Sequence, residues 1–285
     1  MKISVSSYSY SQYINAGKMD LFGAVETAKK QGYEGIEFTD LPFEGNERLE
    51  LAAALKEKAE KEGIAIVAYS VGANLYQGSP EADEKEVTRL KEQADVAAAL
   101  GCGIMRHDVC WSLAAGRSFG LMLPTIAANA RKITEYAQTK GIRTCTENHG
   151  FICQDAYRME QLFNAVGHEN YGLLVDIGNF CCADEICPKS VGIVAPYAIH
   201  CHAKDMQLSK IKMDGFSKTR MGNYFAGVVL GEGDCGVYYS LRALKTAGYD
   251  GWCSVEYEGR LDCVEAVGRC RENLESMFKA IDEEK

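Results

Sequence analysis

The chain has 285 residues, is 47% hydrophobic and 25% charged, and carries a formal net charge of −9, which is typical of a globular protein. The acidic surplus argues against a nucleic-acid partner, because phosphate contacts require an excess of Lys and Arg. No run reaches the roughly 18 apolar residues of a membrane-spanning helix, so we expect no membrane partner.

The 12 cysteines are scattered, and none forms a Cys-x-x-Cys pair. The first residues lack the apolar stretch of about 7–15 residues found in a secretory signal peptide. We therefore expect a cytoplasmic protein with reduced thiols, most of which serve as small core side chains.

Eight short β-rich runs alternate with helical patterns along the chain. The runs begin near Lys2, Glu34, Ile64, Gly103, Ile142, Tyr171, Tyr197 and Trp252. Apolar residues at helical spacing fill segments such as 21–28, 49–59, 87–97, 126–137 and 264–281. A doubly wound sheet fits this alternation, but eight near-regular units favour a closed α/β barrel, the (β/α)8 TIM barrel. With no linker or low-complexity segment, we expect residues 1–285 to form a single TIM-barrel domain.

The seventh and eighth runs are separated by a long connection. It contains Asp205 to Asp234, which has no helical pattern. Connections longer than about 12–15 residues are usually functional or disordered. In a barrel this connection lies on the face where active sites form.

Polar side chains follow several of the predicted strands, where barrel enzymes place their catalytic groups. Glu147 and His149 are two residues apart, so they point the same way at a strand end. Asp176 and Glu256 each follow an apolar run, where a charge is costly unless it is paired or bound to metal. With His202 from the neighbouring strand, these residues give three carboxylates and one imidazole (Glu147, Asp176, His202, Glu256). This oxygen-rich ligand set indicates a site for a hard or borderline divalent ion such as Mn²⁺ or Mg²⁺ rather than a zinc site built from thiolates.

Each of these residues also has a purely structural interpretation. A single Asp or Glu at a strand end is commonly a helix cap or an ion-pair partner, and His200 fits a hydrogen-bonded core histidine. Four such residues at successive strand ends favour the metal site. Cys201 alternates with His200 and His202, so we expect it to face the helix layer.

Further polar and aromatic residues are candidates for substrate binding. His107 and Trp111 fit a sugar-facing wall. Glu37 is either a pocket residue or a buried structural carboxylate. Lys204 either lines the pocket or pairs with Asp205. Arg220 either binds sugar hydroxyls or a phosphate, or is an ordinary solvated loop residue.

At these positions the chain resembles the sugar phosphate isomerase/epimerase family, whose barrel is like that of xylose isomerase. The resemblance covers nearly the whole chain. It is carried by Gly32-Tyr33-Glu34-Gly35-Ile36-Glu37, the Glu147 strand, Val175-Asp176, His202-x-Lys204-Asp205, Gly231-Glu232-Gly233-Asp234 and Gly248-Tyr249-Asp250-Gly251-Trp252…Glu256.

The resemblance implies a metal-dependent enzyme acting on a keto-sugar. A divalent ion, expected to be Mn²⁺ with Mg²⁺, Co²⁺ or Zn²⁺ as alternatives, would be held by Glu147, Asp176, His202 and Glu256. In the epimerases of this family the two Glu ligands act as acid and base on opposite faces of the substrate. Glu147 and Glu256 would then exchange a proton α to the carbonyl, giving isomerisation or epimerisation.

Two positions depart from the epimerase pattern. Asn179 replaces the substrate-contacting His of an Asp-x-x-His motif, and His149 stands beside the ligand Glu147. This version resembles a subgroup that includes the catalytic subunit of C-glycoside deglycosidases, lyases that act on 3-keto-glycosides by β-elimination. His149 would be the base in that alternative, since imidazole accepts protons near neutral pH.

Two other classes of protein are weaker alternatives. Apurinic endonucleases use the same barrel, but they resemble a three-zinc design that requires more ligands than the 5 His of this chain supply. A non-catalytic scaffold subunit would not need the full ligand set. A homo-oligomer or a second small subunit is compatible with the sequence, which identifies no interface.

Overall fold

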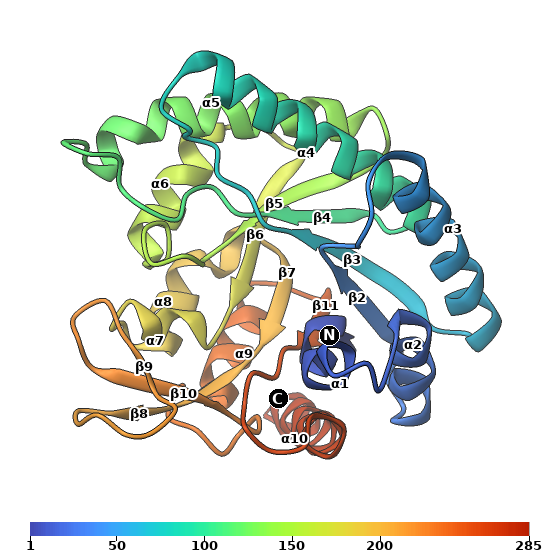
Figure 1. Ribbon diagram of the computed structural model, residues 1–285. Coiled ribbons are helices and arrows are strands. Elements are labelled where there is room, and N and C mark those ends of the chain that lie inside the picture. The colour runs from blue at the N-terminus through green and yellow to red at the C-terminus, as the bar shows by residue number, and fades with distance from the viewer. Residues whose placement is uncertain (285) are drawn as a thin grey trace.

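Eight parallel strands close into a barrel that the major helices surround (Figure 1). This computed structural model describes residues 1–284. The barrel consists of β1 Lys2–Ser6, β2 Gly35–Thr39, β3 Ala65–Val71, β4 Ile104–His107, β5 Arg143–Glu147, β6 Tyr171–Asp176, β7 Ala198–Ala203 and β11 Trp252–Val255. β1 pairs in parallel with both β2 and β11, so the sheet closes on itself. The predicted (β/α)8 barrel is confirmed, and the doubly wound alternative is wrong because such a sheet has two free edges.

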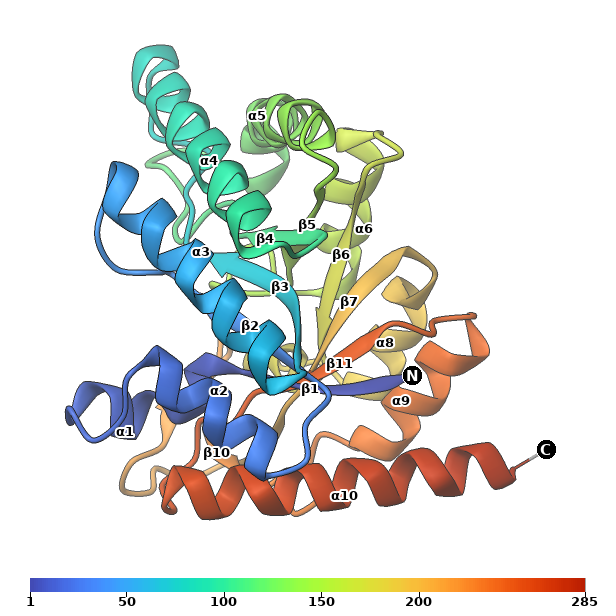
Figure 2. The ribbon, with the colours of Figure 1, turned by 90° about the vertical axis from the view of Figure 1, so that its right-hand side faces the viewer.

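The helices lie outside the barrel, with the exception of short turns at its rim. They are α1 Ser11–Asn15, α2 Leu21–Lys30, α3 Gly45–Glu62, α4 Pro80–Leu100, α5 Phe119–Gln138, α6 Ala156–Val166, α7 Asn179–Cys182, α8 Cys187–Val194, α9 Val237–Thr246 and α10 Cys263–Glu283, with 3-10 turns η1 Ser7–Tyr10 and η2 Ala195–Tyr197. Figure 2 shows α10 running beneath β1 and β11, which it contacts. Among the helices of residues 1–284, none is both long and apolar enough to cross a bilayer.

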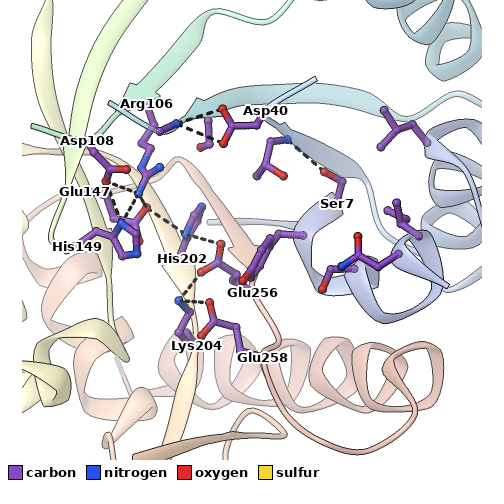
Figure 3. A pocket seen from close by; sticks show the side chains of 18 of the residues that line it. Ser7, Asp40, Arg106, Asp108, Glu147, His149, His202, Lys204, Glu256 and Glu258 are labelled. Atoms are coloured by element: carbon purple, nitrogen blue, oxygen red, sulfur yellow. Dashed lines mark hydrogen bonds and ion pairs between the residues drawn. The ribbon is translucent and has the colours of Figure 1, made fainter. Parts of the chain in front are cut away.

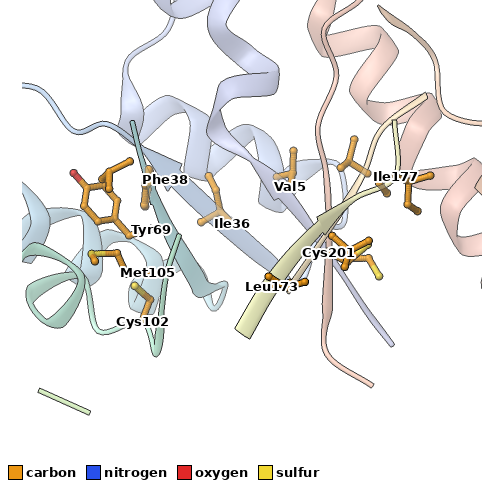
Figure 4. Close-up of a cluster of buried hydrophobic side chains, with 14 of the residues drawn as sticks. Val5, Ile36, Phe38, Tyr69, Cys102, Met105, Leu173, Ile177 and Cys201 are labelled. Carbon is orange, nitrogen blue, oxygen red and sulfur yellow. The ribbon is translucent and has the colours of Figure 1, made fainter. Parts of the chain in front are cut away.

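The outward-facing strand residues form an apolar belt between the barrel and the helices (Figure 4). Phe38, Tyr69 and Leu173 in this belt are completely buried. Cys201 lies in the same belt, on the side predicted for it. Burying such side chains stabilises the fold by about 1.5–3 kcal/mol each, so the belt is the main source of stability.

The inward-facing strand residues are mostly small or polar. Ser4, Ser70 and Ser254 lie inside the barrel together with the charged and imidazole side chains of the carboxyl-terminal half. The Ser4 and Ser254 hydroxyl groups hydrogen-bond each other at 2.8 Å across β1 and β11. The narrow, polar interior leaves room for a group of ionisable side chains at one end of the barrel.

The long connection between the seventh and eighth barrel strands is ordered. It folds into a small antiparallel sheet of β8 Asp205–Ser209, β10 Tyr224–Val228 and β9 Ser217–Lys218, in that spatial order. Asp205 fixes its base, because its carboxylate accepts hydrogen bonds from the backbone N–H groups of Gly231, Gly233 and Cys235 at 2.9–3.1 Å. Asp205 therefore does not pair with Lys204.

Replacing Asp205 by Ala is expected to lower the free energy of unfolding by about 1–3 kcal/mol, since three backbone donors, one buried and two partly buried, lose their acceptor. Amide hydrogen exchange should accelerate in residues 205–236. Denaturant unfolding and exchange mass spectrometry measure both effects. Asp214→Ala is a matched control, because Asp214 lies in the same connection but is fully exposed. Unchanged exchange in Asp205→Ala would contradict this role.

Candidate active site

A cavity of about 560 Å³ opens at the carboxyl ends of the barrel strands (Figure 3). Its polar side contains Glu147, His149, His202, Lys204 and Glu256. Its other side is formed by residues that follow the first two strands, among them Tyr8, the apolar Ile14, Leu21 and Pro42, and polar residues such as Asp40. The carboxyl-terminal face is where barrel enzymes carry their active sites.

Four side chains from successive strand ends converge at the polar side. Glu147, Asp176, His202 and Glu256 each present one ligand atom, and these atoms all lie within 4.8 Å of one another. His202 Nδ1 lies 3.5 Å from Glu256 Oε1, 3.6 Å from Asp176 Oδ2 and 3.9 Å from Glu147 Oε2. Metal–ligand bonds of about 2.0–2.2 Å place neighbouring donor atoms roughly 3–4 Å apart, so the spacing fits a divalent cation.

Two of these donor atoms are buried without a hydrogen-bond partner. Within residues 1–284, neither His202 Nδ1 nor Asp176 Oδ2 forms a hydrogen bond. Lys204 Nζ approaches Asp176 Oδ2 at 3.0 Å as an ion pair, but not in hydrogen-bonding geometry. Unpaired buried polar atoms are costly, and a cation held by this set would satisfy both.

Lys204 is a buried cation among the same carboxylates. Its Nζ lies 2.5 Å from Glu256 Oε2 and 3.2 Å from Glu258 Oε1. The backbone of Gly178 makes this approach feasible, because a Cβ at that position would lie 2.9 Å from the Lys204 Cγ. Burial lowers the pKa of Lys204, but the opposing effect of the Asp176 and Glu256 charges is larger. The net pKa is therefore well above its usual value. Lys204 therefore offsets part of the negative charge of the site.

Glu37, on β2, is completely buried inside the barrel and does not line the cavity. Its Oε2 is 2.7 Å from His200 Nε2 and 3.0 Å from His202 Nε2, and its Oε1 accepts from Ser70 Oγ at 2.5 Å. Of the two readings that the sequence allows, the structure places Glu37 as a buried structural carboxylate. Because it accepts from Nε2 of His202, it directs Nδ1 of that ring toward the other three ligands.

Replacing Glu37 by Gln is expected to weaken divalent-metal affinity by about 10–100-fold, which is the usual effect of losing a carboxylate behind a metal-binding His. Calorimetric titration with Mn²⁺ measures the affinity, and circular dichroism verifies that the variant folds. An unchanged affinity in a folded variant would show that Glu37 does not act through His202.

A second polar cluster adjoins Glu147 (Figure 3). Arg106 Nη2 lies 2.7 Å from Glu147 Oε2 and 2.8 Å from Asp108 Oδ1. Asp108 Oδ1 also lies 2.9 Å from His149 Nδ1, and the His149 ring is in edge-to-face contact with Trp111 at 4.8 Å. Gly150, at φ +76°, permits this contact, because a Cβ there would lie 3.3 Å from the Trp111 ring.

Electrostatic interactions in this cluster shift the pKa of both partners. Burial lowers the pKa of His149, but the hydrogen bond to Asp108 and the charge of Glu147 outweigh it, so the pKa is raised. For Asp108, burial raises the pKa, while the Arg106 charge and the His149 hydrogen bond lower it to below its usual value. The ionised Asp108 carboxylate therefore stabilises the charge that His149 acquires when it accepts a proton.

Three residues expected to contact substrate lie elsewhere. His107 is completely buried, with Nδ1 2.9 Å from the carbonyl oxygen of Asp108, because it alternates with the inward-facing Arg106. Arg220 bonds Asp155 Oδ2 at 2.9 Å and the carbonyl oxygen of Phe151, and so joins two loops outside the cavity lining. Asn179 lies behind the ligands and donates from Nδ2 to Glu147 Oε1 at 2.7 Å. Trp111 and Lys204 do line the cavity.

Several cavity residues were not predicted. Arg106 and Asp108 flank the predicted residue His107, and their side chains point to the opposite face of the strand. Tyr8, Asp40 and Glu258 also line the cavity. Alternation along the β4 and β11 strand ends would have identified Arg106, Asp108 and Glu258. No sequence pattern distinguished Tyr8 or Asp40, which lie in the turns after β1 and β2.

The family model described as xylose isomerase-like TIM barrel matches residues 25–280, and the chain belongs to this family. Among solved structures it is similar to an IolI protein with a bound zinc atom, with a TM-score of 0.77 and 18% identity over 99% of both chains. It is similar to L-ribulose 3-epimerase, with a TM-score of 0.77 and 14% identity over 99% of this chain and 96% of that one. It is also similar to the probable 3-DHS dehydratase AsbF of Bacillus anthracis, with a TM-score of 0.74 and 17% identity over 96% and 99%.

These identities establish a shared fold. No curated protein matches the chain. The narrower resemblance to C-glycoside deglycosidase subunits stays a prediction.

Proposed function

We propose that the protein is a divalent-metal-dependent enzyme that removes a proton α to the carbonyl group of a keto-sugar. The observation that carries the proposal is the convergence of Glu147, Asp176, His202 and Glu256, two of which have buried donor atoms without hydrogen bonds. The names of two similar structures, an L-ribulose 3-epimerase and an IolI protein with zinc, support a sugar substrate and a metal. Mn²⁺ is the expected ion, with Mg²⁺, Co²⁺ and Zn²⁺ as alternatives.

The side chains of the site divide into ligands and charge-balancing groups. A divalent ion bound there would polarise a carbonyl group and stabilise the negative charge of an enediolate. Burial raises the pKa of Glu256, but the charge of Lys204 outweighs it, so the pKa is well below its usual value. Lys204 is also placed to donate a hydrogen bond to a sugar hydroxyl or carbonyl oxygen. Burial of the whole group strengthens these electrostatic interactions.

The first outcome is isomerisation or epimerisation. Glu147 and Glu256 come from strands on opposite sides of β6 and β7, so a substrate between them would meet one carboxylate on each side. One carboxylate would remove the α-proton, and the other would return a proton to the same carbon or to its neighbour. This is the two-carboxylate arrangement that the family resemblance implies.

A second candidate outcome is β-elimination, which the geometry of His149 favours. Glu147 accepts from Asn179 and forms an ion pair with Arg106, and Glu256 is paired with Lys204, so both carboxylates are already engaged. Within the described residues, His149 Nε2 forms no hydrogen bond, and the ring lines the cavity. His149 would then remove the α-proton while a β-substituent leaves, as in the dehydration named for the Bacillus anthracis protein.

The size and lining of the cavity are compatible with the larger substrate of the second candidate. Ligand pockets commonly measure about 300–1,000 Å³. This cavity measures about 560 Å³, and the side opposite the ligands combines Ile14, Leu21 and Pro42 with polar residues such as Asn15 and Asp40. A 3-keto-glycoside would place its sugar beside the ligands and its aglycone against the three apolar side chains.

Product analysis separates the two outcomes. The metal-loaded protein is incubated in D₂O with free ketoses and, separately, with 3-keto-glycosides. Deuterium in an intact sugar identifies an isomerase or epimerase, and release of aglycone identifies a lyase. The absence of both from every substrate, in protein that holds its metal, would overturn the proposed function.

A further inference from the structure

The His149 ring is held at one of its two nitrogens. Nδ1 lies 2.9 Å from Asp108 Oδ1 and 3.2 Å from Arg106 Nη2. A carboxylate oxygen accepts a proton from Nδ1, whereas a guanidinium nitrogen donates one to it, so the two neighbours favour opposite tautomers. Which neighbour prevails decides whether Nε2, on the cavity side, carries a proton or a lone pair.

Distances and charges at Nδ1 decide between the two neighbours. Arg106 Nη2 donates to Asp108 Oδ1 at 2.8 Å and lies 3.2 Å from His149 Nδ1, whereas Glu147 Oε2, at 2.7 Å, is an ion-pair partner only. The Asp108 carboxylate lies closer to Nδ1, at 2.9 Å, and an ionised carboxylate can only accept a hydrogen bond. Charge-assisted bonds are roughly twice as strong as neutral ones, and Nη2 already has Asp108 as its nearer, charged acceptor. The carboxylate therefore prevails, and Nδ1 donates to Asp108.

We propose that Asp108 is a positioning residue that fixes the tautomer of His149 with its proton on Nδ1, leaving the Nε2 lone pair in the cavity as a proton acceptor. Arg106 holds the Asp108 carboxylate in place, because its Nη2 donates to Oδ1 at 2.8 Å. The catalytic part of the inference rests on the proposed function, in which His149 removes a substrate proton. The tautomer itself does not depend on the identity of the substrate.

A purely structural role for Asp108 makes a different prediction. If Asp108 were only the ion-pair partner of Arg106, the His149 ring would be free to rotate or to change tautomer. The position of the ring argues otherwise, since Trp111 packs edge-to-face against it and Asp108 is buried beneath it. The ring is therefore held by a hydrogen bond at one edge and an aromatic contact at its side.

Nitrogen NMR of the full chain labelled with ¹⁵N-histidine measures the tautomer directly. The protein is loaded with diamagnetic Zn²⁺ or Mg²⁺, and the spectrum is recorded where the ring is neutral. His149→Gln identifies the His149 signals by their loss. We expect a proton-bearing Nδ1 and an unprotonated Nε2. A proton on Nε2 in the unmodified protein would overturn the proposal without any variant.

Asp108→Asn tests the causal link. The variant is expected to shift His149 toward the tautomer with a proton on Nε2, and to lower kcat by about 10²-fold with KM and metal content unchanged. Asp108→Glu should restore part of kcat. Asp95→Asn is the matched control, because Asp95 pairs with Lys140 on the outer helix layer. An unchanged His149 spectrum in Asp108→Asn would contradict the positioning role.

The two proposals fail separately. If no sugar undergoes proton exchange or elimination while His149 has the expected tautomer, the proposed function is wrong and the positioning role stands. If catalysis occurs but Nε2 carries the proton, Asp108 does not position a base and the proposed function is unaffected.

Discussion

Asp176→Asn is expected to lose the bound divalent ion and to lower turnover by about 10³-fold or more. Asp176 is completely buried, and within residues 1–284 its Oδ2 has an ion pair with Lys204 but no hydrogen bond, so this atom has room for a metal ion as a further partner. An amide is a neutral and weaker ligand. The loss of several kcal/mol of charge stabilisation at the carbonyl corresponds to a rate loss of this size, at 1.36 kcal/mol per tenfold.

Metal analysis after dialysis and calorimetric titration with Mn²⁺ measure the binding. His202→Ala should behave in the same way, because its Nδ1 lies within 3.5–3.9 Å of the three carboxylates. Asp95→Asn again serves as the control and should retain metal and activity. An Asp176→Asn protein that binds metal with full stoichiometry and normal affinity would contradict the assignment.

His149→Ala is expected to keep its metal and to lose turnover by about 10²–10⁴-fold, the usual contribution of a positioned acid–base group. Its Nδ1 is bonded to Asp108 and its ring lines the cavity, whereas the four proposed ligands form a separate set that does not include it. Loss of catalysis without loss of metal is therefore the signature of a base. It would favour elimination over the two-carboxylate outcome.

The comparison requires metal content and turnover on the same preparation. His149→Gln adds a variant of similar volume that keeps a polar group beside Trp111. His168→Ala is the matched control, because His168 lies in the loop after α6, away from the cavity lining. Full turnover in both His149 variants would exclude a catalytic role for this ring and favour Glu147 or Glu256 as the base.

The barrel could be predicted because its signals are local. Each β-rich run begins within one residue of a strand in the structure, since buried parallel strands require short apolar runs and each crossover requires a helix. The small sheet formed by β8, β9 and β10 was not predicted. Its base depends on one buried carboxylate, Asp205, that accepts bonds from residues 26 to 30 positions later. Such a nonlocal contact has no periodic signature.

The candidate site was predicted where strand alternation was applied consistently. Alternation relates Glu147 to His149 and His200 to His202, and the structure brings these side chains into the barrel or its cavity. The same rule at β4 selects Arg106 and Asp108 and turns His107 into the layer outside. His107 was predicted to line the cavity because of its imidazole group, without regard to the face of the strand on which it lies. The prediction was wrong, because His107 is buried outside the cavity lining.

The roles of Glu37 and Asn179 depend on contacts between different strands. Glu37 on β2 bonds two histidines on β7, and Asn179 bridges Glu147 and Lys204. Strand order places β2 and β7 on different sides of β1 and β11, and only the narrow interior brings their long side chains together. A sequence identifies these residues as candidates, but their partners follow from the closed geometry.

The most direct test is a crystal structure of the protein with Mn²⁺ and a substrate analogue, with anomalous scattering locating the ion. We predict one ion bound by Glu147, Asp176, His202 and Glu256, with the analogue's carbonyl oxygen beside it. His149 Nε2, or a carboxylate oxygen of Glu147 or Glu256, should lie within about 3–3.5 Å of the carbon that loses its proton. An ion bound elsewhere, or an analogue whose α-carbon faces none of these three side chains, would contradict the account.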